Sequence, residues 1–209
     1  MMIVPINREA HRDMPQETAA LSARASLRAQ LLQHRQGLTQ SEHAQRNAQM
    51  VAELLEWLRQ NLPADACIAL YHAFKGEPDL SALADAWRAQ GGSVLLPIVR
   101  EKHAPLVFAF ASDTDALVEG AYGILEPRCA PSDWVCAPKS IHAMLMPCVG
   151  FTSEGYRLGY GGGYYDRTLA DWQAQGWALP TLIGVAHHEG RVAFKPAEHD
   201  VAMDLICVV

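Results

Sequence analysis

The N-terminal part of the chain alternates apolar and polar residues with the period of a helix. Leu27, Leu31 and Leu38 recur at intervals of four and seven, which predicts a helix over residues 21–37 with one apolar stripe. A second helical pattern follows a capping box and ends at a proline, at Thr39, Glu42, Val51, Leu54, Leu55, Leu58 and Pro63. Two amphipathic helices therefore precede the first strand.

Further along, short continuous apolar runs alternate with helical patterns. The runs predict buried strands at residues 67–71, 94–99 (interrupted by Pro97), 106–110, 144–149, 181–186 and 205–209. Helical patterns lie between them at residues 80–87 and 164–174. This alternation is typical of an α/β fold. We expect one three-layer αβα domain over residues 21–209, with a mainly parallel, Rossmann-like sheet and helices on both faces, and an N-terminal extension over residues 1–20.

Such a fold predicts where a ligand binds before any motif is considered. Ligands of open parallel sheets sit beyond the carboxyl ends of the strands. Four segments follow strands in this way, at residues 72–77, 98–100, 150–164 and 187–189. We therefore look for functional residues in these segments first.

The third of these segments leads into a glycine-rich run at residues 157–169. Glycines at 159, 161, 162 and 163 stand directly ahead of a predicted helix. Glycine permits close approach of the backbone to a ligand, and a helix N-terminus offers unpaired N–H groups to an anion. Arg157 can donate two hydrogen bonds to a phosphate, and Asp166 in the first helical turn can hold Mg²⁺. The alternative is a plain glycine turn with an exposed Arg157.

The spacing of the glycines excludes two well-known phosphate loops. A P-loop needs Gly-Lys-Ser/Thr at its end, and this run lacks it. A Gly-x-Gly-x-x-Gly fingerprint fails because Tyr164 stands three residues after Gly161. The residues alone indicate a phosphate-binding loop of unassigned type.

Composition and charge narrow the class of protein. The net charge of −6 argues against a general nucleic-acid binder, so an anionic ligand must be bound by a local cluster of basic residues. The five cysteines form no Cys-x-x-Cys pair, which is typical of a reducing, cytoplasmic location. The apolar runs are too short to span a bilayer, so we expect no membrane partner.

The first helix carries a candidate cluster of this kind. Arg24, Arg28 and Arg35 fall within a ~40° arc that borders the leucine stripe. Arginines in that position can lean over a neighbouring pocket. The alternative is a solvated flank whose aliphatic stems cover the apolar surface.

Several other polar residues follow strands and have competing explanations. Glu77 can hold a polar ligand edge or can be a solvated turn carboxylate. Tyr160 and Tyr164 can cover a flat heterocycle or can anchor the loop. Histidines at 187, 188 and 199 invite a transition-metal site, but their spacing does not fit one. Asp166 and Asp200 suit a hard cation that bridges phosphates better.

Two stretches, Met146 to Phe151 and Arg157 to Arg167, resemble the signature of the 5-formyltetrahydrofolate cyclo-ligase family, also called methenyltetrahydrofolate synthetase. Weaker similarities extend this resemblance over roughly residues 21–206, at Arg24 to Arg28, Tyr71 to Glu77, Gly123 to Pro127 and His199 to Asp200. The glycine signature is highly specific, whereas the other pieces are weak on their own.

The resemblance implies an ATP- and Mg²⁺-dependent cyclisation of 5-formyltetrahydrofolate to 5,10-methenyltetrahydrofolate, with release of ADP and phosphate. It implies ATP contacts from Arg24, Arg28, Arg157, Leu158, Gly159, Tyr160, Gly161, Gly162, Gly163, Tyr164 and Tyr165. It implies folate contacts from His72, Glu77, Tyr160, Gly161, Gly162, Gly163 and Tyr164. By the same pattern Asp166 and Asp200 bind Mg²⁺, and Arg157, Tyr164 and Asp166 are catalytic.

Three residues depart from the family's pattern and keep other hypotheses open. Thr152 replaces a frequent aspartate, Gly190 a frequent glutamine, and Arg24 the usual lysine. The first two leave room for a non-catalytic protein that binds folate or nucleotide, or for an ATP-dependent enzyme with another formamide or amide substrate. The protein is expected to be a monomer or a weak oligomer.

Overall fold

The computed structural model describes residues 17–111 and 117–209. The helix predicted at residues 21–37 is α1, Glu17–Gln36, so it begins inside the predicted N-terminal extension. Residues 1–16 of that extension lie outside the described residues. The capping box is confirmed: Thr39 caps α2, Gln40–Asn61, and the Glu42 side chain accepts from the Thr39 N–H.

Within the described ranges, six strands form one sheet in the order β10-β9-β6-β1-β2-β3. Their bounds are β1 Cys67–Ala69, β2 Ser93–Ile98, β3 Val107–Phe110, β6 Ala143–Pro147, β9 Thr181–Ala186 and β10 Leu205–Val208. All neighbours are parallel except β2 and β3, which pair antiparallel. The prediction of a mainly parallel α/β sheet is thus confirmed. The strand predicted to be interrupted by Pro97 runs on through it, with Pro97 opposite Phe108.

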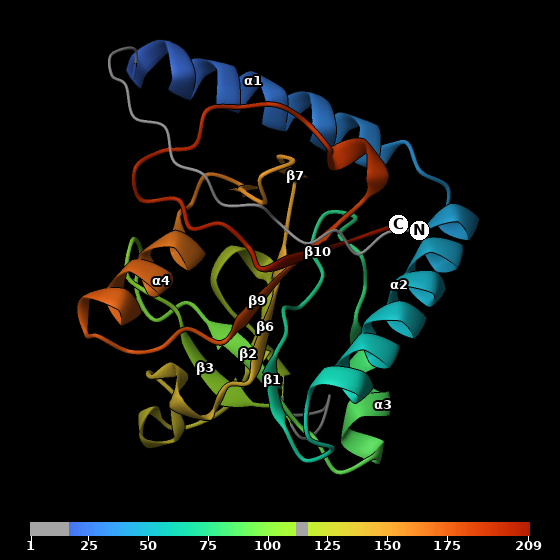
Figure 1. Ribbon diagram of the computed structural model, residues 1–209, viewed down its shortest axis with the longest axis vertical. Helices are drawn as coiled ribbons and strands as arrows, with labels where there is room; N and C mark the ends of the chain where they lie inside the picture. Colours follow the sequence, from blue (N-terminus) through green and yellow to red (C-terminus); the bar gives the residue numbers. More distant parts are fainter. Residues whose placement is uncertain (1–16, 112–116) are drawn as a thin grey trace.

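Helices cover both faces of this sheet (Figure 1). α2 and α3, Ser81–Ala89, lie on one face, and α4, Tyr164–Ala174, lies on the other. The strand residues alternate between the two faces because successive side chains of a strand point in opposite directions. Ile68 and Leu70 join the α2–α3 core, whereas Cys67 and Ala69 join the core under α4. The two apolar layers hold the sheet rigidly between them.

The first helix takes a different place from the others. α1 crosses the end of the molecule at which β6 leads into β7, Gly150–Phe151 (Figure 1). Its apolar stripe packs against this exit rather than on a sheet face. Leu31 lies so close to Gly150 that a Cβ added there would stand 2.9 Å from Leu31 Cδ1. The basic border of α1 is thereby brought to the carboxyl edge of the sheet.

Two hairpins complete this edge. β7 pairs with β8, Arg157–Leu158, directly ahead of the glycine loop. β4, Leu117–Glu119, pairs with β5, Leu125–Pro127, across the 3₁₀ turn Ala121–Gly123. The remaining 3₁₀ turns are Pro131–Asp133, Pro138–Ser140 and η5, His188–Gly190. The strands of the second hairpin are three residues each, which is too short for sequence periodicity to predict.

Candidate active site at the carboxyl edge of the sheet

The chain changes direction along the sheet at β1. It leaves β1 towards β2 on one side and later returns to place β6 on the other side. The loops that follow the strands on either side of such a switch point enclose a crevice. A cavity of about 640 Å³ lies there, lined by the turn after β1, the glycine loop and α1. The cavity therefore lies at the carboxyl edge of the sheet, where the order of strands along the sequence predicted a ligand site.

The cavity gathers nearly all the residues predicted for the site. It is lined by Arg24, Arg28, His72, Glu77, Arg157, Gly159, Tyr160, Gly161, Gly162, Gly163, Tyr164, Tyr165, Asp166 and Asp200. Leu158 is different: its side chain is fully buried and does not line the cavity. The backbone of Leu158 is used within the protein, since its carbonyl accepts from the Val149 N–H at 2.9 Å.

The glycine loop is shaped for close approach by other groups. Gly161 has φ 98° and Gly163, the N-cap of α4, has φ 65°, which is backbone that glycine adopts without strain. Among the described residues, no side chain caps α4. The first amides of α4 are therefore open to an anion at the helix's positive end.

Arg28 lies directly against this loop. Its Nε donates to the carbonyl of Gly159 at 2.6 Å, and a Cβ at Gly161 would stand 3.6 Å from its Cζ. Burial, together with the neighbouring guanidinium of Arg24, lowers the pKa of Arg28. Among the described residues, Arg28 forms no direct ion pair with a carboxylate.

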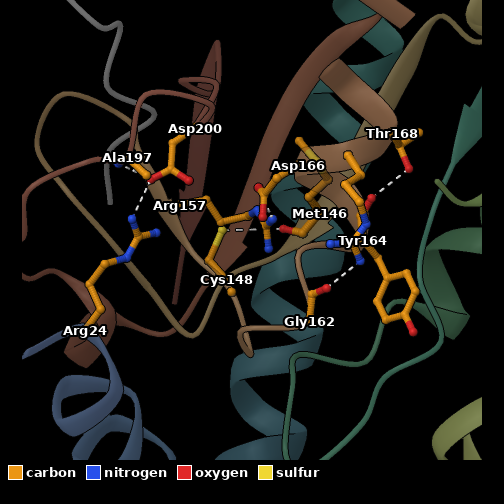
Figure 2. A network of polar contacts seen from close by, with 12 residues as sticks. Arg24, Met146, Cys148, Arg157, Gly162, Tyr164, Asp166, Thr168, Ala197 and Asp200 are labelled. Atoms are coloured by element: carbon orange, nitrogen blue, oxygen red, sulfur yellow. Dashed lines mark hydrogen bonds and ion pairs between the residues drawn. The ribbon is translucent and has the colours of Figure 1, made fainter. Parts of the chain in front are cut away.

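Two ion pairs lie beside Arg28. Arg24 Nη1 meets Asp200 Oδ2 at 2.8 Å, and Arg157 Nη2 meets Asp166 Oδ1 at 2.7 Å (Figure 2). The first pair is largely buried, with side chains 11% and 5% exposed. Burial opposes the charge of Arg157, but Asp166 beside it raises the pKa of Arg157 above its ordinary value. Two of the three arginines predicted for ATP, and both carboxylates predicted for Mg²⁺, are thus paired with each other.

Two polar atoms in this cluster lack a partner among the described residues. They are Nε of Arg24 and the hydroxyl of Tyr165, both buried. A buried polar group without a hydrogen bond is costly unless a ligand or water supplies one. A phosphate in the cavity would offer acceptors to these donors.

Glu77 has an unusual environment for a carboxylate in a turn. It is 6% exposed, and its Oε2 accepts from the Phe74 N–H at 2.8 Å. Burial raises the pKa of Glu77 to about 7, although the guanidinium groups of Arg35 and Arg157 act in the opposite direction. The reading of Glu77 as a solvated turn residue is wrong. A buried carboxylate whose pKa is raised by burial instead lines the cavity.

The sequence did not point to several residues that form the opposite wall. Tyr122 lines the cavity from the β4–β5 hairpin, and its hydroxyl lies 2.7 Å from that of Tyr164. The buried Glu126 fixes this hairpin by accepting from the Val99 N–H at 3.1 Å. Pro97 and Leu106 add carbon surface. The signal available in the sequence was the run Gly123 to Pro127, which matched the family's pattern but was too weak to assign.

The histidine-based metal reading finds no support in the described residues. His187 is buried and its Nε2 donates to the Gly76 carbonyl at 3.1 Å, whereas the adjacent His188 is exposed. Within residues 17–111 and 117–209, no three His, Cys, Asp or Glu side chains gather as a metal site. A hard cation shared with phosphate oxygens would need only Asp166 and Asp200.

Two of the three departures from the family's pattern, Thr152 and Gly190, lie outside the cavity, whereas Arg24 lines it. Thr152 is buried in the β7–β8 turn, where its hydroxyl accepts from the Tyr156 N–H at 3.3 Å. Gly190 packs on the backbone, since a Cβ there would meet the Val149 carbonyl oxygen at 3.3 Å. Neither residue lines the cavity, so neither removes a polar group from it.

Comparison with known proteins agrees with this geometry. The sequence profile of the 5-formyltetrahydrofolate cyclo-ligase family matches residues 20–209. The chain belongs to this family. It is therefore a cyclo-ligase enzyme of folate one-carbon metabolism, and membership of the family implies an ATP-dependent ligase. The resemblance seen in the glycine signature is confirmed.

Individual relatives cover most of the chain. The 5-formyltetrahydrofolate cyclo-ligase of Haemophilus influenzae is 31% identical over 178 residues, which are 84% of this chain and 91% of the relative. That of Mycolicibacterium smegmatis is 32% identical over 187 residues, 87% of this chain and 91% of the relative. The solved 5,10-methenyltetrahydrofolate synthetase of Mycoplasma pneumoniae superposes with a TM-score of 0.67 at 26% identity, covering 88% of this chain and 96% of that one.

The structure of the Aquifex aeolicus 5,10-methenyltetrahydrofolate synthetase gives the same TM-score, 0.67, at 28% identity, over 88% of this chain and 89% of that one. Separately, none of the helices in the described ranges combines the length and apolar composition that a membrane span requires.

Proposed function

We propose that this protein cyclises 5-formyltetrahydrofolate to 5,10-methenyltetrahydrofolate by phosphorylating the formyl oxygen with ATP. The observation that carries the proposal is the meeting of Arg24, Arg28 and Arg157 with Asp166 and Asp200 beside the glycine loop. These groups come from three segments far apart in the chain. Positive donors, open backbone amides and two carboxylates are what a triphosphate and its cation need.

The formyl oxygen explains why ATP is needed. Attack of N10 on the formyl carbon gives an adduct whose oxygen leaves poorly. Transfer of the γ-phosphoryl group to that oxygen converts it into phosphate, which then departs as the C–N double bond forms. Such a transfer needs alignment and neutralisation of charge more than a protein nucleophile. The products are ADP, phosphate and the methenyl folate.

The residues present fit Mg²⁺, although the metal itself is a proposal. Asp166 and Asp200 offer carboxylate oxygens, the ligands Mg²⁺ prefers, and the remaining positions would belong to phosphate oxygens and water. When bound, Mg²⁺ supplies neutralisation of phosphate charge. The protein itself pairs each carboxylate with an arginine before ligands bind, since Arg24 binds Asp200 and Arg157 binds Asp166. Arginines that turn to phosphate release the carboxylates for the cation.

The folate half is proposed to lie against Glu77, His72, Tyr160 and Tyr164. The ionised carboxylate of Glu77 can accept from N–H groups of the pterin, while the tyrosine rings cover a flat heterocycle. Intramolecular attack by N10 is fastest when the folate is held with N5 and N10 close together. A preformed cavity that holds this shape lowers the entropic part of the barrier.

Turnover with purified protein tests the proposal. Addition of ATP, Mg²⁺ and 5-formyltetrahydrofolate should produce the methenyl absorbance with equimolar ADP and phosphate. Omission of ATP, or of Mg²⁺ by chelation, should stop it. A folded protein that binds folate by calorimetry but gives no methenyl product would overturn the proposal and favour a binding protein. Product formed equally fast from another formamide would redirect the substrate assignment.

A further inference from the structure

Arg35 carries a buried guanidinium and is not among the residues that line the cavity. It is 4% exposed and lies at the end of α1, behind the cavity wall. Its Nη2 donates to the Cys148 carbonyl at 2.8 Å, one residue beyond β6, and its Nη1 donates to the Tyr160 hydroxyl at 3.0 Å. Burying a charge costs free energy unless it is hydrogen-bonded, and these two bonds hold the guanidinium of Arg35 in one position.

The stem of Arg35 supports the turn after β1. Gly76 has φ 74°, and a Cβ there would meet Arg35 Cγ at 3.1 Å, so the turn backbone rests on this side chain. His187 holds the same residue by donating from Nε2 to its carbonyl at 3.1 Å. The turn is thus fixed by Arg35 and by His187.

Tyr160 carries the contact on to the front of the cavity. Its hydroxyl accepts from Arg35 and donates to the Phe74 carbonyl at 3.2 Å. The N–H of Phe74 in turn donates to Glu77 at 2.8 Å. One continuous chain of hydrogen bonds therefore runs from Arg35, through Tyr160 and Phe74, to the carboxylate of Glu77.

We propose that Arg35 is a positioning residue for the folate half of the site: it fixes Tyr160 and the turn at residues 74–77 so that the Glu77 carboxylate faces the substrate. This inference rests on the proposed function. It separates the three arginines of α1 by task, because Arg24 and Arg28 lie in the phosphate end and Arg35 acts through Tyr160 on the folate end.

The charge of Arg35 adds a second effect. Burial raises the pKa of Glu77 to about 7, and the hydrogen bond from the Phe74 N–H and the charges of Arg35 and Arg157 act to lower it. The other groups facing Glu77 are neutral at that pH: the phenols of Tyr71 and Tyr165 and the thiol of Cys148. Loss of the Arg35 charge therefore raises the pKa of Glu77 and reduces its ionised fraction at neutral pH.

Two substitutions separate position from charge. Arg35→Lys keeps the charge but loses the planar fork that reaches the Tyr160 hydroxyl and the Cys148 carbonyl from two separate nitrogens, and Arg35→Gln removes the charge as well. Both should raise KM for 5-formyltetrahydrofolate about tenfold, which corresponds to about 1.4 kcal/mol, with the calorimetric Kd for ATP within twofold of the parent protein. The acid limb of kcat/KM should move to higher pH in Arg35→Gln and stay in place in Arg35→Lys. Arg59→Gln on the exposed face of α2 is the matched control.

Tyr160→Phe tests the same contact if an Arg35 variant folds poorly. In the double variant with Arg35→Lys, the effect on folate KM should be smaller than the two single effects combined. Both substitutions disturb the same hydrogen bond, between Arg35 and Tyr160. Equal losses in folate and ATP affinity, additive effects, or an unmoved acid limb in a folded Arg35→Gln would each overturn the proposal. Failure of the parent protein to turn over would refute the proposed function, whereas folate binding by calorimetry still tests Arg35.

Discussion

At one end of the cavity the guanidinium groups of Arg24 and Arg157 meet the carboxylates of Asp200 and Asp166, whereas the wall beside β2 offers carbon atoms from Pro97, Val99 and Leu106. At the charged end two of the three arginines are paired with carboxylates, and such an ion pair can be exchanged for a phosphate and a cation together. The carbon wall has no partners to exchange and selects by shape. We therefore expect phosphate to bind by exchange of ion-pair partners and the pterin ring to bind by burial against carbon atoms.

Glu77 and Tyr160 lie between these two chemistries. Glu77 is a single carboxylate that no described arginine pairs directly, and the Tyr160 ring tilts against Phe74 with centroids 6.2 Å apart. Substitutions at the charged end should therefore change metal and ATP dependence, and substitutions towards the wall should change folate dependence. Four substitutions test this division, in decreasing order of expected effect.

The largest effect is expected from Asp166→Asn. Loss of one carboxylate of the proposed cation site should lower kcat about a thousandfold, the size of effect found when charge stabilisation is removed from an active site. Arg157 would keep only a neutral partner, so the free energy of unfolding should fall by about 1–3 kcal/mol. Turnover and urea unfolding measure the two effects. Asp171→Asn, on an exposed position of the same helix, is the control, and near-parental turnover of Asp166→Asn would end the metal assignment.

Glu77→Gln should weaken folate binding and increase the stability of the folded protein. The pKa of Glu77 rises from 4.5 to about 7 on folding, so the folded state binds more protons than the unfolded state between these values. Stability is therefore lost as pH rises through this window, by on the order of 3 kcal/mol. The glutamine variant should lack this loss while its folate KM increases. Urea unfolding below and above the window measures it, and parallel curves for the two proteins would contradict it.

Arg24→Met should act in opposite directions on the two ligands. KM for ATP should rise about 10- to 100-fold because a phosphate donor is lost, equivalent to about 1.4–2.8 kcal/mol. Mg²⁺ or Mn²⁺ without nucleotide should bind more tightly, because Asp200 no longer has a guanidinium 2.8 Å away. Calorimetry of each ligand alone measures this, with Arg59→Met as the control. Weaker binding of both ligands would show that the ion pair is only structural.

The smallest effect is expected from Tyr122→Phe. It removes the exposed hydrogen bond between the hydroxyls of Tyr122 and Tyr164, 2.7 Å apart, and leaves the ring in place. Folate KM should change by no more than about threefold, since such a bond contributes about 0.5–1 kcal/mol. The bond raises the pKa of Tyr164, so an ultraviolet titration should show this pKa nearer its ordinary value in the variant. A large change in ATP KM would break the division between the two ends.

Much of the site could be predicted because its chemistry is concentrated in short segments. The glycines between 159 and 163 and the carboxylate of Asp166 share one loop and one helical turn, so their proximity follows from sequence spacing. Arg35 could not be assigned in this way. Its arc on the helix suggested a pocket, yet whether it entered the cavity or lay behind it depended on where α1 settled.

Sequence alone was enough to predict the αβ alternation, the capped second helix and the glycine loop ahead of α4, because each depends on residues within a few positions of one another. Only the tertiary structure decided that β3 runs antiparallel, that Tyr122 reaches Tyr164, and that Arg24 pairs with Asp200 across 176 positions. Such pairings depend on how apolar layers pack and where they place the segments between them. No local period encodes that distance.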